Sequence, residues 1–225
     1  MKRQVTGQWA VITGASNGIG FELAKQFAMN GFDLLVVADD PGVAEAARVF
    51  SKYGVEVESL QVDLAEHGGV EKLYRRIQQE PRSLDVLTMN TGLGISGAPF
   101  NSTDLDKDLN LISLNIMSVV HLTKYVLKDM LEVGHGRILF TSGLADFMPG
   151  PFDSVYAASK AFVQSFANGL RQETKDKDIT IKCLQPESKK VHPAEVARIG
   201  FENLMDKNNV VGNIINKQVT HYLSL

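Results

Sequence analysis

Tyr156 and Lys160 are the residues whose types and spacing most directly suggest chemistry. They stand four positions apart in Ser154–Lys175, a stretch that predicts a helix, so their side chains share one face. A free tyrosine has a pKa of about 10 and is a poor base at neutral pH, but a cation within ~4–6 Å can lower that pKa by about 1–3. Lys160 can supply this cation. Taken alone, a Tyr-x-x-x-Lys pattern is better explained by an ordinary amphipathic helix.

Ser142 adds a second polar group to this pair. It lies fourteen residues before Tyr156, at the C-terminal end of the expected strand Arg137–Ser142. Ligands of open α/β sheets bind at the carboxyl ends of the strands. A serine there and a tyrosine near the start of the next helix can converge on one substrate oxygen.

Short apolar runs alternate with stretches of helical period along the chain. The expected strands are Trp9–Thr13, Asp33–Ala38, Val55–Val62, Leu84–Asn90, Arg137–Ser142 and Ile179–Leu184, with a seventh candidate at Val210–Ile215. The expected helices are Phe21–Asn30, Pro41–Tyr53, Gly69–Gln79, Asp104–Glu132 (ended by Gly134 and Gly136), Ser154–Lys175 and Pro193–Met205. This alternation predicts an α/β fold with a doubly wound parallel sheet of Rossmann type, in three layers (α/β/α). Residues 1–225 are expected to form a single domain.

A glycine-rich turn follows the first expected strand and leads directly into a helix. It reads Thr13-Gly14-Ala15-Ser16-Asn17-Gly18-Ile19-Gly20. Such a turn lets the backbone approach a pyrophosphate, and the N-terminus of the helix supplies N–H donors and a favourable dipole. Glycine spacing alone is a weak signal, but its position between the first strand and a helix strengthens the prediction of dinucleotide binding.

The spacing Gly-x-x-x-Gly-x-Gly, with Thr13 in front and Ile19 between the last two glycines, resembles the short-chain dehydrogenase/reductase family. The resemblance continues in the family's order and approximate spacing through an acidic residue after the second strand, Asp63-Leu64, Asn90-Thr91-Gly92, Asn115, Ser142, Tyr156-x-x-x-Lys160 and Gln185-Pro186. It implies an oxidoreductase that transfers a hydride between a nicotinamide cofactor and a ketone or secondary alcohol. Thr91 departs from the usual Ala, a change that predicts only a local adjustment.

The resemblance also implies a role for each catalytic candidate. Tyr156 would exchange a proton with the substrate oxygen, and Lys160 would favour the phenolate and hold the nicotinamide ribose. Ser142 would donate a hydrogen bond to the substrate oxygen as charge develops there. Asn115 would orient a water that links Lys160 to solvent. A second interpretation of Asn115, a polar residue that caps a local helix irregularity, is compatible with the first.

The same resemblance assigns a set of cofactor contacts. They are Gly14, Ser16, Asn17, Gly18, Ile19, Gly20, Asp39, Asp63, Leu64, Asn90, Gly92, Tyr156, Lys160 and Pro186. Asp39 falls where NADP-type relatives often have Arg, and the glycine-rich turn carries no basic residue. A carboxylate there would repel a 2′-phosphate and could reach the ribose. NAD is therefore the expected cofactor, with NADP left open, and Asp63 is expected near the adenine. The alternative for Asp39 is a solvent-facing acidic turn without a cofactor contact.

The sequence departs most from the family after Pro186. Residues 187–192 pass almost directly to the next helix, so about twenty residues that close over the substrate in this family are absent. Either the protein lacks this lid or a segment is missing from the sequence; the good match of both flanks favours the second explanation. An intact mass of 24.7 kDa would exclude this second explanation, the missing segment. Substrate identity and reaction direction stay open, although Phe147, Met148, Pro149 and Phe152 are expected to line an apolar pocket wall.

Composition excludes several other classes of protein. The net charge is −3 and the pI is about 6.0, so nothing indicates a nucleic-acid partner. The five histidines and the single Cys183 show no metal-ligand spacing, and no metal is expected. No apolar run approaches the ~18 residues of a membrane span, so no membrane partner and a cytoplasmic location are expected. The two longest expected helices, Asp104–Glu132 and Ser154–Lys175, resemble those that pair between subunits of this family, and this resemblance predicts a homodimer or homotetramer.

A second hypothesis comes from another class of function. The protein could be a catalytically idle NAD-binding regulator or scaffold of the same fold. The shortened lid region favours this alternative, whereas Asn115, Ser142, Tyr156 and Lys160 together favour an enzyme.

Overall fold

Seven parallel strands form a single sheet in this computed structural model, which describes residues 7–90, 92, 98–142, 154–186, 192–206 and 213–215. The strands are β1 (Trp9–Thr13), β2 (Asp33–Ala38), β3 (Val57–Gln61), β4 (Val86–Met89), β5 (Gly136–Thr141), β6 (Ile179–Gln185) and β7 (Asn213–Ile215). Their order across the sheet is β3-β2-β1-β4-β5-β6-β7. The chain order therefore reverses between β1 and β4, and ligands bind at such a switch point in doubly wound sheets.

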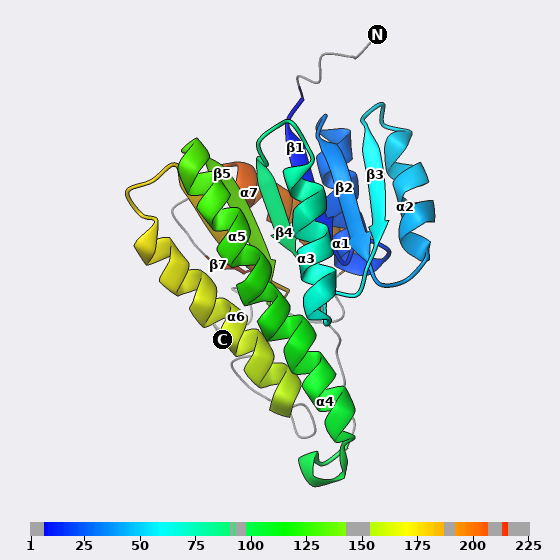
Figure 1. The fold of residues 1–225 in the computed structure, drawn as a ribbon, viewed down its shortest axis with the longest axis vertical. Helices are drawn as coiled ribbons and strands as arrows, with labels where there is room; N and C mark the ends of the chain where they lie inside the picture. The colour runs from blue at the N-terminus through cyan, green and yellow to red at the C-terminus, as the bar shows by residue number, and fades with distance from the viewer. Residues whose placement is uncertain are drawn as a thin grey trace, which may run out of the picture.

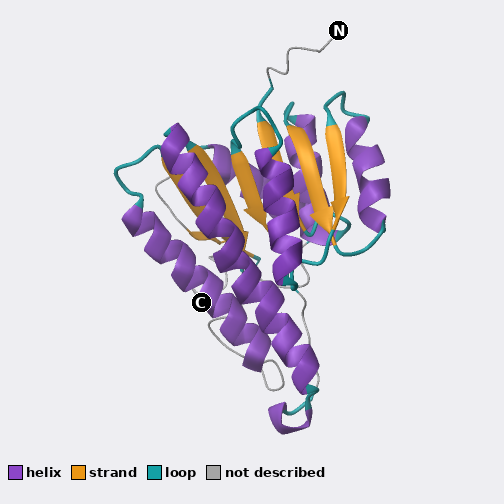
Figure 2. Cartoon of the chain, in the orientation of Figure 1, coloured by secondary structure: helices purple, strands orange, loops and turns teal. Residues whose placement is uncertain are grey.

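Helices cover both faces of this sheet, as Figures 1 and 2 show. The helices are α1 (Gly18–Met29), α2 (Gly42–Ser51), α3 (His67–Gln78), α4 (Leu105–Ile112), α5 (Ser118–Val133), α6 (Ser154–Glu173) and α7 (Pro193–Met205). One core cluster joins the sheet to α1, α2 and α7, and a second joins it to α3, α5 and α6. The predicted three-layer, doubly wound α/β fold is confirmed.

Strand β1 shows why its apolar run is continuous. Ala10 and Ile12 belong to the cluster under α1 and α7, whereas Val11 belongs to the cluster under α3 and α5. All three side chains are fully buried. Because successive side chains of a strand point to opposite faces, a strand covered by helices on both sides needs apolar residues at every position.

The segment expected as one helix over Asp104–Glu132 is interrupted in the structure. A 3-10 turn (η1, Phe100–Ser102) precedes it, and a π-helical turn (η2, Ser113–Met117) separates α4 from α5. The N–H of Ser118 donates to Ser113 O, and the Ser118 hydroxyl donates to Leu114 O at 2.5 Å. That carbonyl is the one the Ser118 N–H would use in a regular α-helix, so the side chain replaces a backbone bond that the π turn removes.

The two glycines expected to end this helix have different roles. Gly134 ends α5 in the left-handed conformation, with φ of 90°. Gly136 instead begins β5, and a Cβ there would lie 2.3 Å from the Met130 Sδ. The prediction that both glycines terminate the helix was thus wrong for Gly136. The missing side chain of Gly136 instead allows β5 to pack closely against Met130 of α5.

The remaining element boundaries differ from expectation by a few residues. Helix α1, for example, begins at Gly18 rather than Phe21, because Gly18 and Gly20 already belong to its first helical turn. Among the described residues, no helix combines the length and the apolar character needed to cross a lipid bilayer.

Candidate active site

The glycine-rich turn packs tightly on the first turn of α1. Gly14 and Gly18 have φ of 63° and 59°, a left-handed conformation that favours glycine. A Cβ at Gly20 would lie 2.0 Å from Gly14 O and 2.5 Å from Asn90 Nδ2. The predicted glycines therefore form a narrow cradle of backbone, which fits a pyrophosphate held at the N-terminus of α1.

The other residues of the turn lie where a cofactor could reach them. Asn17 is exposed and Ser16 is half-buried, and Asn17 Nδ2 donates to Ser16 Oγ at 3.3 Å. Ile19 is half-buried and packs against the core under α1. No acidic side chain occupies the first turn of α1, so the positive end of its dipole is open to an anion.

Thr13 fastens this turn to the neighbouring strand across the switch point. Its hydroxyl donates to Thr88 O at 3.1 Å and accepts from the Asn90 N–H at 3.0 Å. The sequence reasoning assigned no role to Thr13. Its contacts explain how the Asn90 backbone comes within 3.1 Å of the position that a Cβ of Gly14 would occupy.

Lys160 and Tyr156 meet as the helical spacing predicts. Lys160 Nζ lies 5.7 Å from the centre of the Tyr156 ring, and the lysine is only 4% exposed. Its ammonium group donates to Thr141 O at 3.4 Å, and Ser142 Oγ donates to Lys160 O, also at 3.4 Å. The end of β5 and the first turns of α6 thus place Ser142, Tyr156 and Lys160 together.

Asn115 lies in the π turn and connects to the same group. Its Nδ2 donates to Ser159 Oγ at 3.0 Å, and that hydroxyl donates to Tyr156 O at 2.7 Å. Asn115 Oδ1 is buried and has no hydrogen-bond partner among the described residues. Asn115 thus lies in a helix irregularity and offers a buried acceptor inside the site, and its side-chain amide binds Ser159 on α6 rather than the backbone of the π turn.

Gly92 brings Asn115 and Lys160 to one small space. A Cβ at Gly92 would lie 2.5 Å from Lys160 Nζ and 3.7 Å from Asn115 Oδ1. Sequence reasoning placed Gly92 in the cofactor site but missed this close approach, and it missed Ser159 altogether. The only available signal for Ser159 was a polar residue beside Lys160.

The acidic candidates lie at the carboxyl ends of β2 and β3. Asp39 is exposed directly after β2, and its carbonyl accepts from Gln61 Nε2 at 2.8 Å. The neighbouring Asp40 is instead engaged locally, since its Oδ1 accepts from the Gly42 N–H at 2.8 Å. The position of a Cβ on Gly42 is 3.9 Å from Ser16 Cβ, so the turn after β2 lies beside the glycine-rich turn.

The remaining predicted cofactor contacts occupy neighbouring strand ends. Asp63 is exposed, its Oδ1 accepts from the Ala65 N–H at 2.8 Å, and Leu64 is buried. Pro186 follows β6 and is half-buried, next to a fully buried Gln185. Neither amide atom of Gln185 has a hydrogen-bond partner among the described residues. Some predicted features lie outside the described residues. They are the lid region around 187–191, Thr91, and the pocket wall at Phe147, Met148, Pro149 and Phe152.

The sequence matches the model of the short chain dehydrogenase family over residues 8–194. The protein belongs to this family. This is a family of NAD(P)-dependent oxidoreductases, the class that the sequence predicts for the protein. The backbone cradle at Gly14 and Gly20 and the buried acceptor of Asn115 fit a bound nicotinamide dinucleotide. Nothing in the family match favours the idle alternative.

Two curated relatives show the degree of similarity. Very-long-chain 3-oxoacyl-CoA reductase of Anas platyrhynchos is 34% identical over 203 residues, which cover 87% of this chain and 64% of the relative. Very-long-chain 3-oxoacyl-CoA reductase-B of Danio rerio is 34% identical over 193 residues, covering 83% of this chain and 61% of the relative. This short-chain dehydrogenase thus spans less than two-thirds of the length of either protein.

Solved structures agree on the fold over nearly the whole chain. The bulky-bulky ketone specific alcohol dehydrogenase from Comamonas testosteroni superimposes with a TM-score of 0.87 at 26% identity, covering 95% of this chain and 88% of that one. A short-chain dehydrogenase from Sphingobium yanoikuyae in complex with NADPH gives a TM-score of 0.85 at 26% identity, covering 95% and 89%.

Proposed function

We propose that this protein interconverts a ketone and a secondary alcohol, with Tyr156 as the proton donor or acceptor. The observation that carries this proposal is the buried Lys160 ammonium, 5.7 Å from the centre of the Tyr156 ring. A positive charge at that position favours the phenolate and so makes the phenol a stronger acid. A bound nicotinamide would supply or accept the hydride.

Each neighbouring side chain then has a task that its contacts support. The Ser142 hydroxyl, whose bond to Lys160 O is long at 3.4 Å, can turn to donate to the substrate oxygen. Asn115 Oδ1 can hold a water beside Lys160 Nζ, so that a proton lost from Tyr156 is replaced from solvent. Ser159 is a positioning residue, because it links Asn115 to the Tyr156 backbone.

A 3-oxoacyl thioester is the substrate class we favour. The support is the 34% identity to very-long-chain 3-oxoacyl-CoA reductases of Anas platyrhynchos and Danio rerio. In this reaction the 3-oxo group receives the hydride at carbon and the proton at oxygen, which yields a 3-hydroxyacyl thioester. Reduction is therefore the proposed direction.

The test measures how fast the purified full chain oxidises NADH or NADPH in the presence of 3-oxoacyl-CoA substrates with short and with long acyl chains. A bulky aromatic ketone without a thioester serves as the comparison substrate. We expect kcat/KM to be at least about tenfold higher for the thioesters. If only the ketone were turned over, the thioester substrate class would be rejected and carbonyl reduction would be retained. If no carbonyl compound were turned over, both the substrate class and carbonyl reduction would be rejected.

The preference for NAD rests on Asp39 and can be tested separately. Asp39→Asn removes a negative charge where a 2′-phosphate would lie, and two like charges ~4 Å apart in water repel by about 1 kcal/mol. We expect the kcat/KM ratio of NADPH to NADH to rise at least about fivefold. Asp176→Asn, an exposed aspartate after α6, is the matched control. An unchanged ratio in Asp39→Asn would place this carboxylate outside the cofactor site.

The proposed assembly is a homodimer or homotetramer. Several large apolar side chains are exposed along η1, α4, the π turn and α5, and they include Phe100, Leu105, Leu109, Met117 and Val120. Helix α4 also extends beyond the carboxyl edge of the sheet (Figure 1). A second copy of the chain would remove this apolar surface from water.

A further inference from the structure

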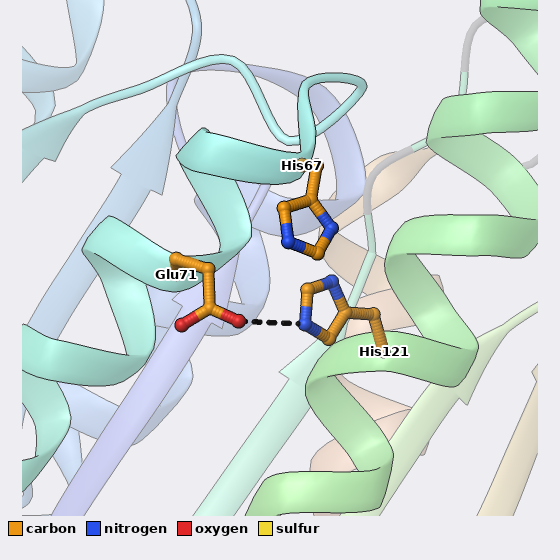
Figure 3. A group of neighbouring side chains, drawn as sticks. All are labelled: His67, Glu71 and His121. Carbon is orange, nitrogen blue, oxygen red and sulfur yellow. Dashed lines mark hydrogen bonds and ion pairs between the residues drawn. The ribbon is translucent and has the colours of Figure 1, made fainter.

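Three potential metal ligands meet between α3 and α5, on side chains that the proposed reaction does not use (Figure 3). His67 is the first residue of α3, Glu71 follows one turn later, and His121 faces them from α5. His121 Nε2 lies 3.0 Å from Glu71 Oε1. One ligand atom from each of the three residues lies within 4.8 Å of the others.

The separations can be compared with those around a bound zinc ion. Zinc binds imidazole nitrogen at ≈ 2.0–2.1 Å and carboxylate oxygen at ≈ 2.0–2.2 Å, so tetrahedral ligand atoms lie roughly 3.4 Å apart. The His121–Glu71 pair, at 3.0 Å, would have to open by only a few tenths of an ångström. Two imidazoles and one carboxylate also form a donor set that zinc uses in proteins.

His67 is the ligand that must move. Its ring stacks on that of His121 with 4.7 Å between centroids and 20° between planes, so the two rings do not aim their nitrogens at a common point. His67 is exposed at the helix end, and the terminal torsion of a histidine is broad. Rotation of this exposed ring is the movement that binding of an ion would require.

The carboxylate, by contrast, is already held in place. The Tyr125 hydroxyl donates to Glu71 Oε1 at 3.0 Å, and the Tyr125 ring stacks on Tyr74 at 4.5 Å between centroids. A charged carboxylate oriented by a tyrosine is the kind of outer support that metal ligands require.

We propose that His67, Glu71 and His121 bind one zinc ion, with water in the remaining position, and so link α3 to α5. This site is separate from Tyr156 and Lys160, and it does not depend on the proposed reaction. Hard cations such as Mg²⁺ prefer oxygen ligands, so they should not compete for a site with two imidazoles. No metal site is evident in the sequence because His121 lies far along the chain from His67 and Glu71, on another helix.

The test is calorimetric titration of the metal-free full chain, purified without a histidine tag, with ZnCl₂ and with MgCl₂. We expect one Zn²⁺ per chain, and a midpoint of thermal unfolding that rises with Zn²⁺ concentration, because a ligand that binds the folded state stabilises it. Mg²⁺ should produce neither effect.

Two variants examine the assigned ligands. His67→Gln and His121→Gln should each weaken Zn²⁺ binding by at least about tenfold, since even the loss of an outer-shell partner costs 10–100-fold. His135→Gln, a histidine outside the cluster, should bind like the unmodified protein. His67 is exposed, so its variant keeps the test valid if His121→Gln fails to fold. No stoichiometric Zn²⁺ binding, or equal affinity in His67→Gln and the unmodified chain, would overturn the proposal.

Discussion

Tyr156→Phe should lower kcat/KM for carbonyl reduction by about 10²–10⁴-fold while leaving the dissociation constant of the cofactor nearly unchanged. The substitution removes only the hydroxyl, and a positioned proton donor contributes an acceleration of that size. The aromatic ring stays, so the contact with the Lys160 ammonium at 5.7 Å is preserved. Steady-state kinetics and fluorescence titration with NADH or NADPH measure the two quantities.

Tyr53→Phe is the matched control for this experiment. Tyr53 is 42% exposed in the turn after α2, so the same chemical change there should leave kcat/KM and cofactor binding unaltered. A Tyr156→Phe enzyme that keeps most of its turnover would exclude this hydroxyl as the proton donor. A proportional loss of cofactor binding would instead assign Tyr156 a binding role.

Gly20→Ala should damage both stability and cofactor binding. The added methyl group would lie 2.0 Å from Gly14 O and 2.5 Å from Asn90 Nδ2, so the glycine-rich turn and α1 must separate. Forcing an extra carbon into a packed region typically costs about 1–3 kcal/mol of folding free energy. We also expect cofactor affinity to fall at least about tenfold, since the displaced atoms belong to the cradle. Urea unfolding and cofactor titration report the two effects.

Gly169→Ala is the matched control for Gly20→Ala and should change the stability in the opposite direction. Gly169 is exposed within α6, and a Cβ there would meet nothing within 4 Å among the described residues. Alanine in a helix interior is favoured over glycine by roughly 0.5–1 kcal/mol, so this variant should be more stable and bind cofactor normally. If Gly20→Ala also proved neutral, the close packing of the turn against α1 would be refuted.

The elements that sequence reasoning predicted well are those governed by local pattern. A continuous apolar run such as Asp33–Ala38 predicts a strand covered on both faces, and β2 has those bounds. Tyr156 and Lys160 could be paired because helical spacing alone brings them onto one face. The family resemblance supplied the order of the remaining candidates, and the family match over residues 8–194 confirmed that resemblance.

Contacts between distant segments were beyond the same reasoning. The local sequence around Gly92 does not indicate that Lys160 Nζ approaches this glycine, because the contact depends on how β4 and α6 pack. The meeting of His67 and Glu71 with His121 likewise depends on the packing of α3 against α5. The cytoplasmic location, the NAD preference and the oligomeric state stay predictions, and so does the missing lid.

The π turn at Ser113–Met117 also has a consequence for which mutations this protein can tolerate. The Ser118 N–H donates to Ser113 O, five residues earlier, so this turn holds one residue more than a regular α-helix. Deleting one residue there would make the same bond an α-helical one, and α5 would keep Leu122 and Val126 against the sheet and His121 beside Glu71. The deletion would instead displace Asn115, which the π turn places against Ser159. A single-residue deletion in this turn should therefore leave the fold intact and damage the site.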